Sequence, residues 1–369
     1  MRVAVAGAGG HTMMALNDAV LDMVEIRLAV DSVLADFLAA KSRSAPPQLT
    51  ELIGTLRRFL FVGGKRIRPV MCVCGWCAAH GRGDPEPVLR AAASLELFHT
   101  SALIHDDVMD DSDTRRGHRS VHASLADRHR SRQGPGDADQ FGANAAILLG
   151  DLALAWSDEL LHSAGLAPVP MRAALGVVNA MRTEVMYGQY LDLLGTGRPT
   201  GNIAYALTVS RFKTAKYTVE RPLHLGGALA GCSTAVMEAC TAYALPIGEA
   251  FQLRDDLLGG FGDPAATGKP ITDDFRHGKC TVLMALAVAR ATPAQLRLLR
   301  ALVGRPDLTE EQADSVRAVL EATGARIAVE RMIARRLRRA MNALDHAPFP
   351  EAAVETLRQL AHAASVRTS

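Results

Sequence analysis

Hydrophobic residues recur at helical spacing along most of the chain, from about residue 28 onward. Alanine and leucine dominate these segments, whereas the alternation of β-branched residues that is typical of strands is scarce. Glycine and proline interrupt the pattern at intervals that leave room for helices of several turns. The chain carries neither a hairpin signal nor a repeat with a period of roughly 20–50 residues. The pattern therefore predicts an all-α fold, a single-domain bundle of about ten or more helices.

Three regions depart from this pattern. Residues 1–27 read as an N-terminal extension that is partly irregular, and residues 28–366 as the folded domain. Within that domain, residues 128–141 are polar and rich in glycine and proline, which predicts a mobile loop. The opening VAVAGAGG resembles the first turn of a dinucleotide-binding fold, but the helical sequence that follows excludes that interpretation.

Charge and hydropathy exclude several classes of protein. The chain has 41 basic and 39 acidic residues and a net charge of +2, which argues against a nucleic-acid-binding protein. No apolar run reaches the roughly 18 residues that a membrane span requires. The N-terminus also lacks a convincing signal-peptide cleavage site, so we expect a cytoplasmic location.

Three of the six cysteines lie together in MCVCGWCAAH, as Cys72, Cys74 and Cys77. A zinc cluster is one interpretation, but residues at offsets of two and five cannot all share one helix face. We therefore expect these thiols to pack as small hydrophobic groups.

A cluster of aspartates ends an apolar helical segment in the sequence HDDVMDDSDTRRG. Asp106 and Asp110 are four residues apart and share a helix face, with Asp107 on its flank. Carboxylates this close repel one another, and a hard cation such as Mg²⁺ relieves that repulsion. Arg115 and Arg116 follow directly, and guanidinium groups suit phosphate. The alternative is a solvated acidic helix end, which the helix dipole disfavours.

A second acidic pair, Asp255 and Asp256, also ends an apolar helical segment. The residues that follow it add further charges: Asp263, Lys269, Asp273, Asp274 and Lys279. Two acidic pairs on separate helices can face each other across a cavity and hold metal ions between them.

Positive charge gathers in a different segment, GGKRIRP, at residues 63–69. Two glycines let the backbone approach an anion closely, and Lys65, Arg66 and Arg68 supply the charge. His99 and the pair Lys213–Thr214 in RFKTAKYT complete the candidate set.

The ordered motifs GGKRIRP, HDDVMD with RRG, KTAKYT, and FQLRDD with TGKP and GKCT resemble the trans-isoprenyl diphosphate synthase family. These enzymes are also called polyprenyl synthetases, and the resemblance covers roughly residues 30–365, most closely to geranylgeranyl diphosphate synthases. It implies an isoprenoid synthase fold, with helices around a central cavity, and a homodimer. It also implies a prenyltransferase that condenses isopentenyl diphosphate with dimethylallyl, geranyl or farnesyl diphosphate and uses several Mg²⁺ ions.

The resemblance also implies roles for individual residues. Magnesium would be held by Asp106, Asp107, Asp110, Asp255 and Asp256. Isopentenyl diphosphate would be bound by Lys65, Arg68, His99 and Arg116. The allylic diphosphate would be contacted by Arg115, Lys213, Lys269 and Lys279. Thr214 and Gln252 would lie near the reacting carbons, where their oxygens would stabilise the allylic cation.

The second acidic motif departs from the family pattern at one position. A third aspartate commonly stands four residues after the first, but Gly259 occupies that place here. Asp263 is a candidate replacement. The departure puts in doubt how tightly one of the metal ions would be bound.

Product length would be set by the residues that precede Asp106 on its helix. Burial of each isoprene unit contributes roughly 3–4 kcal/mol, so growth needs a steric floor to stop it. In the family, bulky aromatics four and five residues before the first aspartate accompany farnesyl-type products, whereas Ala102 and Ser101 stand there in this chain. Phe98 and Leu95 are the predicted floor, with ordinary helix packing as the alternative. We expect geranylgeranyl diphosphate, ahead of a longer product and of farnesyl diphosphate.

Two other functions are alternatives to a prenyltransferase. A class I terpene cyclase would lack GGKRIRP and would carry an Asn/Ser/Glu metal motif in place of Asp255–Asp256. A catalytically silent subunit of a heteromeric synthase would typically have lost aspartates of the first motif, and this chain retains them.

Overall fold

The structure, a computed structural model, describes residues 22–197, 199–262 and 272–365. The first half of the chain contains α1 (Met23–Ser44), a 3-10 turn (Pro47–Leu49), α2 (Thr50–Phe61), α3 (Ile67–Ala78), α4 (Glu86–Met109), β1 (Thr114–Arg115), β2 (His118–Arg119), α5 (Val121–Ser131), α6 (Ala138–His162) and α7 (Pro168–Gly195). The second half contains α8 (Ile203–Ser210), the π-helical segment η2 (Arg211–Glu220), α9 (Arg221–Leu229), α10 (Thr234–Phe261), α12 (Asp273–His277), α13 (Val282–Arg290), α14 (Pro293–Leu302), α15 (Glu310–Ala322), α16 (Ala325–Asp345) and α17 (Glu351–Ser365). The predicted all-α bundle is confirmed.

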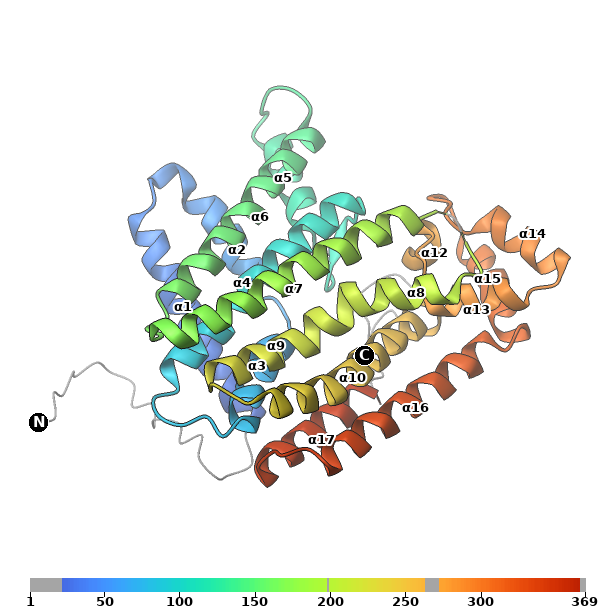
Figure 1. The fold of residues 1–369 in the computed structure, drawn as a ribbon. Coiled ribbons are helices and arrows are strands. Elements are labelled where there is room, and N and C mark those ends of the chain that lie inside the picture. The colour runs from blue at the N-terminus through green and yellow to red at the C-terminus, as the bar shows by residue number, and fades with distance from the viewer. Residues whose placement is uncertain (1–21, 198, 263–271, 366–369) are drawn as a thin grey trace, which may run out of the picture.

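Long helices form the body of the bundle, and α12–α15 gather at one end of it (Figure 1). The most extensive packing joins α6 to both α4 and α5, α3 to α9, and α10 to both α16 and η2. The two short strands pair antiparallel into a small hairpin that follows the first acidic cluster. None of the helices in the described ranges is long and apolar enough to span a membrane.

The buried apolar side chains form two clusters, and α10 contributes to both of them. Tyr243 and Ile247 belong to the larger cluster, which fills the bundle around α3, α4 and α6. Leu253 and Leu257 belong to the smaller cluster, which α10 shares with α13–α16. The acidic end of α10 therefore packs in the smaller cluster, whereas its first half packs in the larger one.

The first helix begins earlier than the sequence pattern predicts. α1 starts at Met23, within the segment expected to be an irregular extension, because Asp22 caps it through a 2.7 Å hydrogen bond from the backbone N–H of Val24. Residues 1–21 of the predicted extension lie outside the described residues.

The prediction of a loop over residues 128–141 is wrong at both of its ends. α5 continues to Ser131 and α6 begins at Ala138, so that only residues 132–137 connect the two helices. The polar character of the segment has a different origin, because Arg128 binds Glu51 on α2 at 2.9 Å. Asp137 accepts hydrogen bonds from the first backbone N–H groups of α6.

The cysteine cluster lies on α3, where Cys72 and Cys74 are fully buried in the larger core cluster. Burial raises the pKa of the Cys77 thiol to about 12. The expectation that these thiols pack as hydrophobic groups is confirmed for Cys72 and Cys74.

Candidate active site

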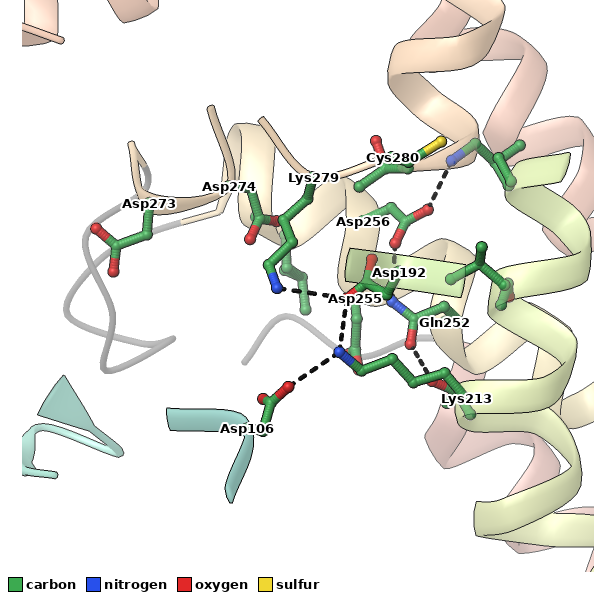
Figure 2. A pocket seen from close by; sticks show the side chains of 18 of the residues that line it. Asp106, Asp192, Lys213, Gln252, Asp255, Asp256, Asp273, Asp274, Lys279 and Cys280 are labelled. Carbon is green, nitrogen blue, oxygen red and sulfur yellow. Dashed lines mark hydrogen bonds and ion pairs between the residues drawn. The ribbon is translucent and has the colours of Figure 1, made fainter. Parts of the chain in front are cut away.

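Two adjoining cavities lie between the carboxyl ends of α4 and α10. The larger has a volume of about 700 Å³ and the smaller about 480 Å³. Their walls share seven residues: Asp106, Arg115, Lys213, Thr214, Phe251, Gln252 and Asp255. Figure 2 shows part of this wall, with side chains from the two acidic motifs and η2 turned toward one space. Segments that are far apart in sequence therefore form one site, as the motifs predict.

The carboxylates of the first acidic motif form ion pairs with cations from two other segments. Asp106 lies 3.0 Å from Lys213 Nζ on η2 and 3.1 Å from Arg115 Nη2, while Asp110 lies 2.6 Å from Lys279 Nζ. Burial opposes ionisation of Asp106, but Lys213 and Arg115 outweigh it and hold its pKa well below the usual value. Asp106 therefore faces the cavity as a negative charge, and Asp110 lines the smaller cavity in an ion pair with Lys279.

Asp107 turns away from its two neighbours in the motif. Its side chain is fully buried and accepts a 2.8 Å hydrogen bond from Arg115 Nε. It is absent from the residues that line either of the two cavities just described. Its place in the fold suits positioning of Arg115, and its predicted contact with metal stays a prediction.

Asp192 on α7 is a site residue that sequence reasoning missed. Its carboxylate lies 2.7 Å from Lys213 Nζ and 3.4 Å from Lys279 Nζ, and so joins the two lysines that reach the first motif (Figure 2). Gln189, one turn earlier, donates a 3.0 Å hydrogen bond to Asp106. An amide and a carboxylate three residues apart in YGQYLD were the available sequence signal.

The two aspartates of the second motif have different surroundings. Asp255 lines both cavities. Asp256 is buried and accepts hydrogen bonds from Gln252 Nε2 at 2.8 Å and from the backbone N–H of Val282 at 3.2 Å (Figure 2). Burial raises the pKa of Asp256 to about 7, and the nearby Asp274 and Asp255 carboxylates add to this. Asp256 thus ties α10 to the start of α13, and its predicted contact with metal stays a prediction.

The residues expected near the reacting carbons form one hydrogen-bonded chain. Thr214 Oγ1 donates to Gln252 Oε1 at 2.6 Å, and Gln252 in turn donates to Asp256. Because the amide nitrogen is held by Asp256, the carbonyl oxygen of Gln252 is fixed toward Thr214. Both residues line the cavities, so oxygen atoms face the space between the acidic and basic groups.

The basic residues predicted to bind isopentenyl diphosphate lie together in the larger cavity. Its wall includes four of them: Lys65, Arg68, His99 and Arg116. Arg68 donates to Thr218 at 2.7 Å and lies over the Tyr217 ring, whose hydroxyl is 3.1 Å from His99 Nδ1. Burial, together with the neighbouring arginines, holds the pKa of His99 well below its usual range. A region rich in positive charge therefore lies beside the acidic one.

Arg66 has a different role from Lys65 and Arg68 in the same motif. It is buried, has a left-handed backbone (φ 49°), and forms ion pairs with Asp31 at 2.7 Å and Glu96 at 2.9 Å. These bonds tie the GGKRIRP loop to α1 and α4. The sequence does not distinguish an arginine that binds substrate from one that anchors the loop.

The residues proposed to limit product length lie in two layers. Ala102 lines the larger cavity, next to Leu103. Leu95, Phe98 and Ser101 are buried in the bundle. Phe98 packs edge-on against Tyr217 with 5.7 Å between ring centroids, so it lies behind a residue of the cavity wall.

Lys269, predicted to contact the allylic diphosphate, lies outside the described residues.

A model of the Polyprenyl synthetase family matches residues 50–322 of the chain. The chain belongs to the polyprenyl synthetase family. Two curated polyprenyl synthetases are each 32% identical to it. The short chain isoprenyl diphosphate synthase of Methanocaldococcus jannaschii matches over 73% of this chain and 76% of its own length. The (2E,6E)-farnesyl diphosphate synthase of Mycobacterium tuberculosis matches over 81% and 78%.

A solved polyprenyl synthetase structure superposes closely on this one. It is the geranylgeranyl pyrophosphate synthase of Corynebacterium glutamicum, complexed with isoprenyl diphosphate and magnesium. The two chains are 41% identical, with a TM-score of 0.91 over 94% of this chain and all of the other. Fold and motif order therefore agree with the family along nearly the whole chain.

The donor set of this polyprenyl synthetase suits a hard divalent cation that also binds substrate. Within the described ranges, no three His, Cys, Asp or Glu side chains converge into a ready-made metal site. Mg²⁺ commonly takes only one or two carboxylates and completes its shell with phosphate oxygens and water. Asp106, Asp110 and Asp255 supply such oxygens around a cavity that is also lined by Lys213 and Lys279.

Proposed function

We propose that this protein is a magnesium-dependent trans-prenyltransferase that joins isopentenyl diphosphate to an allylic diphosphate. The observation that carries the proposal is the division of the cavity into two anion-binding regions. Asp106, Asp110 and Asp255 line one region, together with Lys213 and Lys279. The other region is lined by Lys65, Arg68, His99 and Arg116. A diphosphate that must ionise suits the acidic, metal-binding region, and one that stays intact suits the basic region.

The chemistry follows from the charges on this wall. Bound Mg²⁺ would supply stabilisation of the negative charge that develops on the departing diphosphate. Lys213 and Lys279 add positive charge from the protein at the same place. The Thr214 hydroxyl and the Gln252 carbonyl present oxygens toward the allylic carbons, where positive charge develops. The isopentenyl double bond attacks this cation, and a proton then leaves, with the diphosphate as the nearest base.

We propose geranylgeranyl diphosphate as the product. Ala102 leaves the larger cavity open one turn before Asp106, and the Tyr217–Phe98 pair provides an aromatic wall deeper in the bundle. The similarity to a geranylgeranyl pyrophosphate synthase supports the same length. A longer prenyl product is the alternative, followed by farnesyl diphosphate, since relatives of this chain include farnesyl, geranylfarnesyl and octaprenyl diphosphate synthases.

We further propose that the chain acts as a homodimer, in the cytoplasmic location expected from the sequence. The support is a band of exposed apolar side chains on α6 and α7: Ile147, Leu148, Met186, Tyr187, Tyr190, Leu193 and Leu194. On α7 these residues recur three or four positions apart and form a stripe along one face. A stripe of this kind suits burial against the same stripe of a second copy.

Product analysis tests the reaction. Purified protein would be incubated with Mg²⁺, isopentenyl diphosphate and each of three starters, namely dimethylallyl, geranyl and farnesyl diphosphate. The dephosphorylated products would be sized by mass spectrometry. We expect linear prenyl alcohols up to the C20 compound, and about a 100-fold or greater loss of rate in Asp106→Asn, because a carboxylate that would hold the Mg²⁺ at the leaving group is lost. Asp113→Asn, an exposed carboxylate of the same acidic segment, is the matched control and should retain activity.

Other results would point to other functions. Cyclic hydrocarbons would identify a terpene cyclase, and no product from any starter would favour a silent subunit. If Asp106→Asn were as active as Asp113→Asn, the proposed metal site would be wrong. Ala102→Phe should shorten the product by narrowing the cavity, and an unchanged length would remove Ala102 from the chain-length wall.

A further inference from the structure

Gly259 stands on the face of α10 that carries Asp255. The two positions are four residues apart, so their side chains would project to the same side of the helix. A Cβ atom added at Gly259 would lie 2.9 Å from Cγ of Asp274 and would overlap the Oδ2 atom of the same carboxylate. The carboxylate of Asp274 therefore fills the space into which a side chain at position 259 would project.

Asp274 is held in this place by its neighbours in the chain. It lies in the short helix α12, and the next residue, Phe275, is buried in the smaller core cluster. The Phe275 ring packs beside Gly260 of α10, since a Cβ at Gly260 would lie 3.5 Å from its Cζ atom. The backbone N–H of Lys279 also donates a 3.0 Å hydrogen bond to the carbonyl oxygen of Asp274. The position of Asp274 over α10 is thus set by core packing.

Asp273, which precedes it, is arranged differently. Its carboxylate pairs with Arg276 of the same short helix at 3.9 Å. Figure 2 shows it directed away from the Asp255–Lys279 wall, whereas Asp274 lies beside Lys279. Asp263, the replacement considered from the sequence, lies outside the described residues.

We propose that Asp274 supplies the third carboxylate of the second acidic motif, in place of the residue that Gly259 lacks. Asp255 from α10 and Asp274 from α12 would then present oxygens to one divalent cation and its diphosphate. This inference rests on the proposed function. It also explains why position 259 needs glycine, because a side chain there and Asp274 in its present position exclude each other.

Direct metal binding tests the inference independently of turnover. Mn²⁺ would be titrated into the protein with inorganic diphosphate present, and free Mn²⁺ would be measured by electron paramagnetic resonance. We expect Asp274→Asn to weaken binding of one ion by about tenfold or more, the range found when a supporting carboxylate is removed. Asp273→Asn removes the same charge one residue away and should bind nearly as the wild type does.

Gly259→Ala provides a second test that removes no charge. Alanine favours a helix more than glycine does, and the atoms that its methyl group meets are the end of the Asp274 side chain rather than backbone, so the unfolding temperature without metal should change little. The added methyl group should nevertheless displace Asp274 and weaken Mn²⁺ binding as Asp274→Asn does. In an Asp274→Ala background, which empties this space, Gly259→Asp should strengthen binding again by returning a carboxylate to it.

The outcomes separate this inference from the proposed function. If Asp274→Asn or Gly259→Ala binds Mn²⁺ as tightly as Asp273→Asn does, the proposed role of Asp274 is wrong. The same holds if an Asp274→Ala, Gly259→Asp double variant binds no better than Asp274→Ala alone. If the wild type makes prenyl products and these variants bind normally, only the inference is wrong. If the wild type makes none and binds no Mn²⁺ with diphosphate, the proposed function is wrong and the inference with it.

Discussion

His99 illustrates how a residue of the basic region is tuned by its surroundings. Its ring is buried beside Tyr217 and near several arginines. Burial first, and these positive charges in addition, hold the pKa of His99 well below its usual value. The ring is therefore neutral near pH 7, and it can accept or donate a hydrogen bond without adding charge.

This depressed pKa predicts a dependence of stability on pH. As pH falls below about 6.5, His99 takes up a proton in the unfolded chain but not in the folded one, so the free energy of unfolding falls. The slope from this one group approaches about 1.4 kcal/mol per pH unit. His99→Gln should remove that part of the slope. Urea unfolding at pH 7.5, 6.5 and 5.5 measures how the free energy of unfolding changes with pH. His118→Gln on the exposed hairpin is the control and should keep the wild-type slope. Equal slopes in wild type and His99→Gln would refute the prediction.

At the scale of single residues, the sequence predicts those members of the site that belong to a motif in which one kind of charge is repeated. Asp106, Asp110 and Asp255, with the four basic residues of the larger cavity, come together as expected. Asp192 and Arg66 were not predicted to have their roles. Each of them acts through a partner from a distant segment, and charge type alone does not distinguish a side chain that faces the cavity from one that anchors a helix.

At the scale of elements, the π-helical segment η2 is positioned by close approach of two neighbouring helices. A Cβ at Gly188 of α7 would lie 2.7 Å from Cα of Lys213, and one at Gly248 of α10 would lie 2.8 Å from Cβ of Ala215. Glycine on both sides lets η2 lie between α7 and α10. Lys213 and Thr214 reach the cavity from this segment.

We predict that Gly188→Ala separates α7 from η2 and displaces Lys213. Overpacking of this kind costs about 1–3 kcal/mol, more than the gain of about 0.5–1 kcal/mol from alanine in a helix. Both the free energy of unfolding and kcat should fall. Gly176→Ala on the same helix is the matched control, since nothing lies within 4 Å of its added Cβ, and it should be neutral or stabilising. Chemical unfolding and steady-state kinetics measure both effects, and identical behaviour of the two variants would contradict the close contact.

The existence of the helices was predictable, but their ends and η2 were not. Residues 128–141 look like a loop because their polar side chains bind Glu51 or cap α6, and neither partner is apparent from local composition. The π-helical turns of η2 leave no distinct mark over ten residues, because apolar spacing alone does not separate them from an α-helix. Packing against Gly188 and Gly248 decides the geometry instead.

At the scale of the whole molecule, the apolar band on α6 and α7 predicts self-association. Placing two charges in it, as Leu148→Glu with Tyr187→Glu, should convert a dimer into monomers, because burying unpaired carboxylates is costly. Light scattering after size-exclusion chromatography measures the mass. Ile327→Glu, an exposed apolar residue on α16, is the control and should leave the mass unchanged. A wild-type protein that is already monomeric would refute the proposed dimer.

The all-α class follows from the hydrophobic pattern, whereas the division of the core does not. Tyr243 and Leu253 lie on the same helix and have similar apolar neighbours in sequence, yet they belong to different clusters. That difference depends on which distant helices pack against each half of α10. The acidic end of α10 belongs to the smaller cluster for this reason, which no local pattern indicates.

The ion pairs that link Lys213 and Lys279 to the aspartates have a consequence for the order in which ligands bind. A divalent cation that takes Asp106 and Asp110 leaves the two ammonium groups sharing the Asp192 carboxylate, and their charge then favours a further anion. A diphosphate that takes the ammonium groups leaves the carboxylates in need of a cation. Each ligand thus removes a competitor of the other, and by thermodynamic reciprocity each strengthens the binding of the other. We therefore expect the site to bind the metal–diphosphate salt more tightly than either ion alone.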